Sequence, residues 1–383
     1  MSKDSIGPKI KRFRKSHHLT QEELAESLGY SHKSVITHIE KGDTDMTYEK
    51  ILLLLRTYML DANELFDVSD IDKRLEEYKI RQGKHKQILV SGLINVETSL
   101  KVDSFPIEYN PIEYPFFGID SVVSGVGYNV AKALKVLGSN VDLLTEIGDD
   151  LNGDIIKKKV NDDKIDSKHV LVCKNSKTAE SIVLVDKDGR RKIYCDLKDI
   201  QDREPLDESV VNFDDYSLTI LTNINFNRTL IKVAHDRKIT VATDVHVLSD
   251  INDSYNKDFM ENADILFLSN EAIIDHEAEF MKEIYNKYHN KIIVCGCGDK
   301  GALMYVGEED KFYFEQAVAP RGISSTVGAG DALFSSFIHF YNKGEKIENC
   351  LRFAVLFAGI KISQPGGSNG FISEKELLDL VGC

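Results

Sequence analysis

Apolar residues follow two different patterns along the chain, and the change between them divides it into two parts. Between residues 6 and 67 they recur every three or four positions, which is typical of short amphipathic helices. From residue 87 onward, short apolar runs alternate with amphipathic segments of helical length. The pattern predicts a small all-α domain over residues 1–68 and a larger α/β domain over residues 87–383, joined by a charged, partly helical linker over residues 69–86.

Within the larger part, six apolar runs are predicted strands: residues 88–94, 141–147, 218–223, 239–245, 264–269 and 291–296. Segments of helical length lie between several of them, at residues 128–137, 226–237 and 271–289. This alternation predicts a doubly wound, mainly parallel sheet with helices on both faces. Residues 97–123 and 170–200 break the pattern, because they carry strand signals without helices, and Asp188-Gly189 is a hairpin signal. These two regions are predicted to form a small β lid.

The N-terminal helices are most clearly delimited in the stretch LTQEELAESLGYSHKSVITHIEKG, residues 19–42. Thr20 and Glu23 form a capping-box signal, and Gly29 is a typical helix terminator. Ser31 is predicted to cap the next helix, which turns its apolar residues inward. The residues left facing outward are polar or basic and suit base edges and phosphates: His32, Lys33, Ser34, Thr37 and His38.

This stretch resembles the Cro/repressor-type (XRE) helix-turn-helix family, from Ile6 to about Val68. In that family the glutamine that opens the second helix contacts a phosphate, and the third helix reads the major groove. The resemblance implies double-stranded DNA as a partner, with a phosphate contact from Gln21 and readout by the outward residues of the following helix. A helical bundle used only for dimerisation or partner contact is the alternative.

Charge and cysteine usage narrow the range of possible binding partners and site types. The net charge of −14 is uneven, because residues 1–86 are close to neutral and begin with a basic cluster, so the acidic excess lies in residues 87–383. Any nucleic-acid contact is therefore predicted for the N-terminal domain. The six cysteines form no CxxC pair, which argues against a disulfide framework or a zinc site. No apolar run approaches the length of a membrane span, so a cytoplasmic protein without a membrane partner is predicted.

The most specific motif is STVGAGDALFSSF, residues 325–337, which opens an apolar helix. Small residues at Gly328, Ala329 and Gly330 leave backbone N–H groups accessible at the helix start, where the dipole favours an anion. Beside a phosphoryl group in that cradle, Asp331 is placed to take the proton of an attacking hydroxyl. The alternative is a structural helix that Asp331 merely caps.

Two further loops carry polar groups where predicted strands end or helices begin. The loop GLINVE, residues 92–97, supplies Asn95 and Glu97, and SGVGYNVA, residues 124–131, is a glycine-rich helix entry that contains Asn129. Ligands of open α/β sheets bind beyond the carboxyl ends of the strands, so these loops are predicted to lie together with the motif that contains Asp331.

Together these loops resemble the ribokinase-like PfkB family of carbohydrate kinases, over about residues 87–381. The resemblance implies that Asp331 is the catalytic base, and that Gly328, Ala329 and Gly330 form the anion hole. It further implies an acceptor pocket lined by Asn95, Glu97, Gly125, Gly127 and Asn129. The nucleotide site that it implies is formed by Asn270, Gly298 and Gly301. Members transfer the γ-phosphoryl group of MgATP to a primary alcohol, often with a monovalent cation near the anion hole, and often dimerise through the lid.

Several positions depart from the family pattern. Ser325 stands where an aspartate is common, which calls the monovalent-cation site into question. Ile273 takes the glutamate place of the Asn-x-x-Glu motif, which weakens the expected hold on Mg²⁺, and Glu271 or Glu277 are the neighbouring substitutes. No metal ligand is assigned from the sequence.

The acceptor loop SGVGYN is closer to the pattern of pseudouridine kinases than to that of ribokinases, with Val126 in place of a lysine. Tyr128 is a candidate to stack on a base, so a nucleoside acceptor is predicted beside free sugars such as fructose or ketodeoxysugars. The sequence therefore predicts an ATP-dependent sugar or nucleoside kinase, a homodimer, fused to a DNA-binding module that regulates transcription. The alternative is a transcription regulator whose kinase-like domain only senses a ligand.

Overall fold

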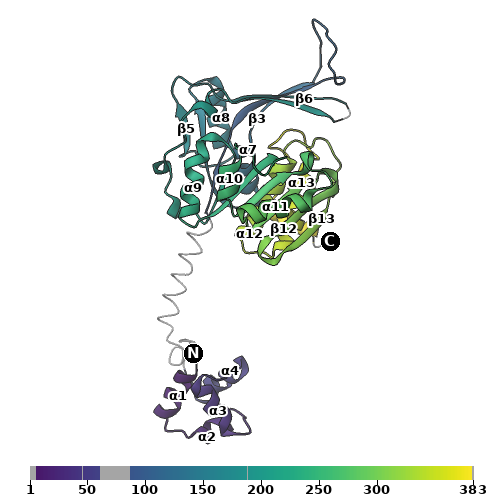
Figure 1. The fold of residues 1–383 in the computed structure, drawn as a ribbon. Helices are drawn as coiled ribbons and strands as arrows, with labels where there is room; N and C mark the ends of the chain where they lie inside the picture. Colours follow the sequence, from purple (N-terminus) through teal and green to yellow (C-terminus); the bar gives the residue numbers. More distant parts are fainter. Residues whose placement is uncertain (1–5, 45, 61–86, 188, 382–383) are drawn as a thin grey trace. The chain divides into compact units, whose positions relative to one another are not determined.

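The computed structural model describes residues 6–44, 46–60, 87–187 and 189–381. The chain divides into two compact units, one on each side of the boundary between Gln82 and Gly83, and each is described by itself (Figure 1). The linker predicted over residues 69–86 and the turn residue Asp188 lie outside the described residues.

The N-terminal unit contains four short helices: α1 Gly7–Ser16, α2 Gln21–Ser27, α3 Lys33–Lys41 and α4 Tyr48–Thr57. Their apolar faces meet in one core that includes Ile10, Leu24 and Ile36. The predicted capping box is present, with the Thr20 hydroxyl accepting the Glu23 N–H and the Glu23 carboxylate accepting the Thr20 N–H. The predicted cap at Ser31 is wrong, because the residue that enters α3 in the extended conformation is His32, and its side chain makes no cap hydrogen bond.

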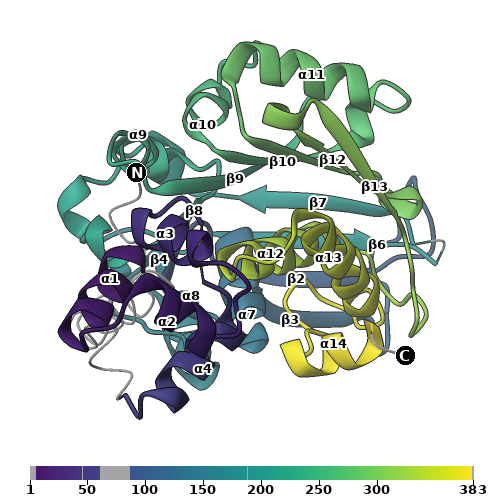
Figure 2. The ribbon, with the colours of Figure 1, turned by 90° about the horizontal axis from the view of Figure 1, so that it is seen from below.

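The larger unit is built on a nine-stranded sheet in the order β13-β12-β11-β10-β9-β8-β1-β4-β5 (Figures 1 and 2). Pairing is parallel from β5 to β11, and β12 and β13 add an antiparallel edge. The strands are β1 Gln87–Ser91, β4 Asn140–Gly148, β5 Val170–Cys173, β8 Leu218–Leu221, β9 Thr240–Val247, β10 Ile265–Ser269, β11 Ile292–Gly296, β12 Gly301–Val306 and β13 Lys311–Gln316. All six predicted strands are present.

Helices cover both faces of this sheet, as Figure 2 shows. Strand β1 explains why, since Ile88 and Val90 enter one apolar core while Leu89, between them, enters the other. On the first face lie α7 Val126–Leu137, α8 Leu151–Asp162, α12 Ala329–Asn342, α13 Ile347–Lys361 and α14 Glu374–Val381. On the second lie α9 Arg228–Asp236, α10 Lys257–Asn262 and α11 Glu277–Tyr288. None of the helices within the described ranges is both long and apolar enough to cross a bilayer.

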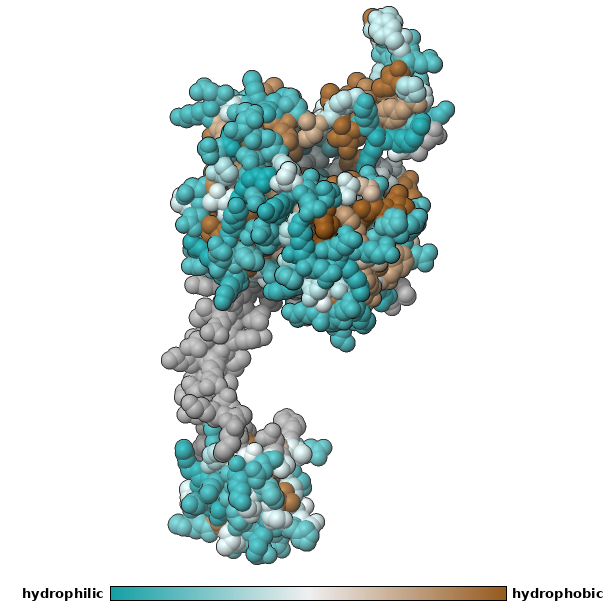
Figure 3. All heavy atoms as spheres, viewed as in Figure 1, coloured by the Kyte–Doolittle hydropathy of each residue, from teal (hydrophilic) through white to brown (hydrophobic). Residues whose placement is uncertain are grey.

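A separate four-stranded sheet, in the order β3-β2-β6-β7, forms the lid. Its strands are β2 Asn95–Lys101, β3 Ile119–Ser124, β6 Glu180–Val185 and β7 Arg191–Asp196. The prediction that all of residues 170–200 belong to the lid is wrong for β5, because its residues extend the parallel ladder of β4 in the main sheet. Several apolar side chains of the lid are exposed, including Phe116 and Phe117, between β2 and β3, and Ile193 on β7. Figure 3 shows apolar residues gathered on this projecting part.

Candidate active site and DNA-binding surface

The aspartate that the sequence predicts to be the base lies against the predicted acceptor loop. Asn129, in the first turn of α7, donates a hydrogen bond from Nδ2 to Oδ2 of Asp331, in the first turn of α12, over 2.7 Å. The two residues are 202 positions apart in the sequence. The fold thus joins the loop predicted to hold the acceptor to the residue predicted to deprotonate it.

The Asp331 carboxylate is held in surroundings that strengthen it as a base. Burial by the surrounding protein raises the pKa of Asp331 above its usual value, and the hydrogen bond from Asn129 opposes this shift. The charges of His246 and Lys361 also lower the pKa, while that of Asp244 raises it. The side chain is nevertheless partly exposed, so a ligand can reach it. A carboxylate whose pKa lies closer to neutrality is a better proton acceptor at physiological pH.

The three small residues before Asp331 differ in what surrounds them. Gly328 has a φ of 79°, in the left-handed region, and a Cβ there would lie 2.3 Å from the carbonyl oxygen of Gly367. The N–H of Ala329 donates to the carbonyl of Thr326 over 3.2 Å. Gly330 faces open space, because a Cβ built on it meets no atom within 4 Å. The open approach at Gly330 lies in the first turn of α12, where N–H groups lack acceptors within the helix.

Two acidic or amide side chains point inward from strand β2 of the lid. Asn95 is buried and donates from Nδ2 to Oγ of Ser181 over 2.9 Å, while its Oδ1 is buried without a hydrogen-bond partner. Burial also raises the pKa of Glu97, and the nearby charge of Asp331 raises it further. A buried acceptor without a donor costs free energy unless a ligand supplies the donor, which a sugar hydroxyl can do.

The glycines of the acceptor loop have a packing role. A Cβ on Gly127 would lie 2.5 Å from the backbone of Gly92, at the end of β1, and Gly125 has a φ of 103° and would meet the carbonyl of Leu93 at 2.6 Å. These residues bring the start of α7 directly onto the end of β1. The structure thus explains both glycines by close backbone approach, and their contact with an acceptor stays a prediction.

The predicted nucleotide residues follow the next parallel strands. Asn270 comes directly after β10 and donates from Nδ2 to Oε1 of Glu277 over 2.7 Å. Ile273, which replaces the family glutamate, is buried in the second core. Gly298 and Gly301 have positive φ angles, 58° and 127°; Gly298 begins the turn after β11, and Gly301 is the first residue of β12. The carboxylate that accompanies Asn270 is therefore Glu277, one of the two substitutes considered from the sequence.

Tyr128 does not face a ligand. Its side chain is fully buried, and its hydroxyl donates a hydrogen bond to Asp163 at the end of α8. The prediction that Tyr128 stacks on a base is therefore wrong, because α7 turns this side chain into the packing against α8.

Three residues near Asp331 were not found from the sequence. Lys361 ends α13 and is fully buried beside the anion-hole loop, and Arg191 of the lid donates from Nη1 to the Thr326 hydroxyl over 3.4 Å. His246, at the end of β9, lowers the pKa of Asp331 when its ring is protonated. A single lysine inside the apolar run AVLFAGIKI was the one usable signal, whereas Arg191 and His246 are surrounded by ordinary polar sequence.

The predicted DNA-reading side chains lie on one exposed side of α3. His32, Lys33, Ser34 and His38 are exposed, and Thr37 is partly exposed. Gln21 is held in place, since it donates from Nε2 to Glu40 over 2.9 Å and accepts the Thr37 hydroxyl over 3.0 Å.

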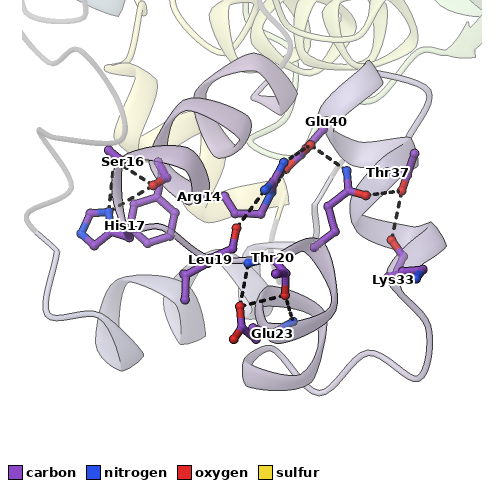
Figure 4. A network of polar contacts seen from close by, with 11 residues as sticks. Arg14, Ser16, His17, Leu19, Thr20, Glu23, Lys33, Thr37 and Glu40 are labelled. Atoms are coloured by element: carbon purple, nitrogen blue, oxygen red, sulfur yellow. Dashed lines mark hydrogen bonds and ion pairs between the residues drawn. The ribbon is translucent and has the colours of Figure 1, made fainter.

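Behind that surface lies a buried ion pair. Arg14 binds Glu40 through two hydrogen bonds of 2.5 and 3.1 Å, as Figure 4 shows. Burial alone would raise the pKa of Glu40, but the hydrogen bonds from Arg14 and Gln21 lower it overall. This network fixes α3 against α1 and α2 and thereby orients the exposed residues of α3.

No group of three or more His, Cys, Asp or Glu side chains gathers at metal-binding distances among the described residues. At the predicted nucleotide site, the carboxylate of Glu277 accepts a hydrogen bond from Asn270.

The fold and the juxtaposed loops are those of a ribokinase-like phosphotransferase, and the comparisons with known proteins agree. Residues 85–374 match the model of the pfkB family of carbohydrate kinases, and residues 10–65 match that of a helix-turn-helix domain. The chain belongs to the pfkB family of carbohydrate kinases, with an N-terminal helix-turn-helix domain, as the sequence predicted.

Similar curated proteins include the acarbose 7(IV)-phosphotransferase of an Actinoplanes strain, 26% identical over 77% of this chain and 98% of its own length. The ribokinase of Dictyostelium discoideum is 24% identical over 76% of this chain and 98% of its own length. Among solved structures, the microbiome-derived acarbose kinase Mak1 superposes with a TM-score of 0.70 at 22% identity, covering 78% of this chain and 99% of its own. The Methanocaldococcus jannaschii nucleoside kinase gives 0.65 at 18% identity, covering 78% and 98%. The predicted ribokinase-like fold is thus confirmed.

Proposed function

We propose that this kinase transfers the γ-phosphoryl group of ATP to a primary hydroxyl of a sugar, with Asp331 as the base. The observation that carries the proposal is the 2.7 Å hydrogen bond between Asn129 and Asp331, because it joins the acceptor loop to the anion-hole loop. Asp331 removes the hydroxyl proton as the acceptor oxygen attacks the γ-phosphorus. A new O–P bond forms, the bond from the γ-phosphorus to the bridging oxygen breaks, and ADP leaves with that oxygen's electron pair.

The backbone amides around Gly330 are assigned to the charge that develops on the transferred group. The open space before Gly330 and the start of α12 support this role. A positioned base contributes about 10²–10⁴ to the rate, and the remainder comes from positioning and charge stabilisation.

On the nucleotide side, Asn270, Gly298 and Gly301 are assigned to ATP. Mg²⁺ commonly uses one or two carboxylates and the phosphates of its own nucleotide, and Glu277 is the carboxylate that we assign to this role. When bound, the metal neutralises charge on the phosphates during transfer.

The acceptor is assigned as the hydroxyl-rich part of a carbohydrate. The unpaired Oδ1 of Asn95, the carboxyl of Glu97 and the amide of Asn129 all suit hydroxyl groups. With Tyr128 buried, the aromatic contact predicted for a base is lost, so a free sugar is preferred to a nucleoside such as pseudouridine.

The helix-turn-helix domain is assigned to DNA binding and to control of transcription by the acceptor. The exposed polar residues of α3, with a lysine and two histidines among them, support DNA contact. Control requires that the ligand bind differently in the DNA-bound and free states. The exposed apolar side chains of the lid, among them Phe116 and Ile193, support a homodimer formed through that sheet.

A panel of acceptors tests the proposal. The purified full chain is assayed for ADP release with free pentoses and hexoses, keto sugars and pseudouridine, and its DNA affinity is measured with and without the best acceptor. The proposal expects turnover with a free sugar and an acceptor-dependent change in DNA affinity. No turnover with any acceptor, but a ligand-dependent change in DNA affinity, would favour the sensor alternative. Turnover with pseudouridine alone would restore the nucleoside assignment.

A further inference from the structure

Lys361, the last residue of α13, has a side chain that is entirely enclosed by protein. Its ammonium group donates to three backbone carbonyl oxygens: those of Val327, of Gly366 at 2.6 Å and of Gln364 at 3.5 Å. An ammonium group has three N–H donors and no acceptor, so the number of donors matches the three carbonyls, with Val327 and Gly366 as the close partners. Lysine is seldom fully buried, and this one lies in an enclosure made of carbonyl oxygens.

The three carbonyls come from two loops that meet at the anion hole. Val327 directly precedes Gly328 in the anion-hole loop, whereas Gln364 and Gly366 belong to the loop after α13. The loops touch, since a Cβ on Gly328 would lie 2.3 Å from the carbonyl oxygen of Gly367. Clusters of backbone carbonyl oxygens are the ligands that replace the hydration shell of K⁺ in proteins. The enclosure thus has the chemistry of a monovalent-cation site, and an ammonium group already occupies it.

The surrounding charges favour a positive group at this point. Asp331 and Glu97 both act on Lys361 to keep it protonated, while Arg191 of the lid opposes them. Burial, the largest influence, lowers the pKa of Lys361 to about 8, so the group is mainly charged at neutral pH.

Ser325, in the anion-hole loop, is the second residue that bears on a cation at this point. It stands where related kinases commonly have an aspartate, and its hydroxyl accepts the N–H of Val327 over 3.3 Å. The chain therefore offers a fixed cation and omits a carboxylate that a free ion would use. The residues of this site fit a lysine ammonium and do not fit an exchangeable ion.

We propose that the ammonium group of Lys361 replaces the free monovalent cation of the anion hole, so that this kinase works without K⁺. The inference rests on the proposed phosphoryl transfer. Lys361 acts as a positioning residue, because it holds the carbonyl of Val327 and with it the amides that follow. Its charge also lies beside the point where negative charge develops in the transition state.

The test compares cations in the full-length protein. Turnover of the best acceptor and the melting temperature are measured in K⁺, NH₄⁺ and tetramethylammonium chlorides at equal ionic strength. The wild type is expected to show the same rate and the same melting temperature in all three salts. Lys361→Ala is expected to lose about 10²–10³ in kcat in tetramethylammonium, the size of effect seen when one anion-hole group is removed. K⁺ or NH₄⁺ should restore part of its activity and raise its melting temperature.

Two further variants sharpen the comparison. Adding Ser325→Asp to Lys361→Ala should increase the apparent affinity for K⁺, because a carboxylate then joins the carbonyls. Lys132→Ala is the control, since Lys132 is another largely buried lysine but pairs with Asp163, the residue that follows α8, and its loss should introduce no dependence on the cation.

The outcomes separate this inference from the kinase assignment. A wild-type rate or melting temperature that rises with K⁺ would overturn it, as would a fully active Lys361→Ala that ignores the cation. Should no acceptor be turned over in any salt, the kinase assignment fails, and the melting temperatures still decide whether Lys361 fills the cation site. Should Lys361→Ala fail to fold, the wild-type comparison decides alone.

Discussion

Asn129 and Asp331 stand at the starts of two helices, α7 and α12, and share a hydrogen bond of 2.7 Å. This bond is one of the influences that lower the pKa of Asp331, against the larger effect of burial. The amide therefore both positions the carboxylate and tunes its strength as a base. It also ties the acceptor loop to the anion hole.

Removing that amide should move the pH profile in a defined direction. Since the base works only when ionised, kcat/KM falls on the acid side as Asp331 takes up a proton. Asn129→Ala removes the hydrogen bond that lowers the pKa of Asp331, so this pKa rises. The acid limb of the kcat/KM profile then moves to higher pH. The measurement is kcat/KM against pH for both proteins. An unshifted limb with a uniformly lower rate would assign Asn129 to acceptor binding alone.

Gly328 and Gly330 provide a matched pair of substitutions. Gly328→Ala places a Cβ against the carbonyl of Gly367 in a backbone conformation that L-residues rarely adopt, so it should lower the melting temperature. Gly330→Ala meets no protein atom and should leave the melting temperature unchanged, yet its methyl group enters the space assigned to the phosphoryl group and should lower kcat. Wild-type kinetics in Gly330→Ala would place the anion elsewhere.

On the DNA side, Lys33 is exposed on α3 and is paired only loosely with Glu22, at 3.4 Å. If it contacts a phosphate, Lys33→Ala weakens binding and reduces the slope of log K against log[salt] by about one. The measurement is fluorescence anisotropy of the full chain with duplex DNA over a range of salt. Lys158→Ala removes the same charge from the exposed side of α8 and should change neither quantity. Equal effects of the two variants would argue against α3 as the contact surface.

His339 should make the stability of the kinase domain depend on pH. Burial lowers its pKa from 6.5 to about 4, although the nearby Glu374 opposes the shift. Between these values the unfolded chain binds a proton that the folded chain does not, so stability is complete above pH 6.5 and declines as the pH falls toward 4. The loss amounts to roughly 3 kcal/mol at most.

Urea unfolding of the kinase domain at several pH values measures this effect. His339→Gln should be less stable at neutral pH and should show a smaller decline between pH 6.5 and 4, since the titrating group is gone. If the free energy of unfolding of the variant declined as much as that of the wild type, other titrating groups would be responsible, and Glu374 would be the first candidate.

Much of this architecture follows from local sequence patterns. The six apolar runs became strands because each is short and bounded by turn residues, and Thr20 with Glu23 capped α2 because capping is a local interaction. Ser31 failed as a cap because the start of α3 is set by the backbone of His32. Strand β5 was misassigned because residues 170–200 were treated as one strand-rich region, whereas β5 pairs in parallel with β4, the strand directly before it, across α8.

The candidate site, too, has residues that could be predicted from the sequence and residues that could not. The role proposed for Asp331 could be predicted from the motif around it. That Asn129 lies beside Asp331 could also be predicted, because both loops lie at the carboxyl ends of the strands of one sheet. Tyr128 was misread because only packing against α8 decides which way the side chain points. Lys361 and Arg191 reach the anion-hole loop from a helix end and from a lid strand, and no spacing in the sequence encodes those contacts.

The most direct measurement of the central claim is phosphoryl transfer from ATP to the best acceptor by the wild type and by Asp331→Asn. The variant keeps the size of the side chain but cannot accept a proton, so kcat should fall by about 10²–10⁴ while the melting temperature and DNA binding are retained. Asp154→Asn, an exposed change of the same kind on α8, should have no effect. An Asp331→Asn enzyme as fast as the wild type would contradict the account, because the base would then have to be another group.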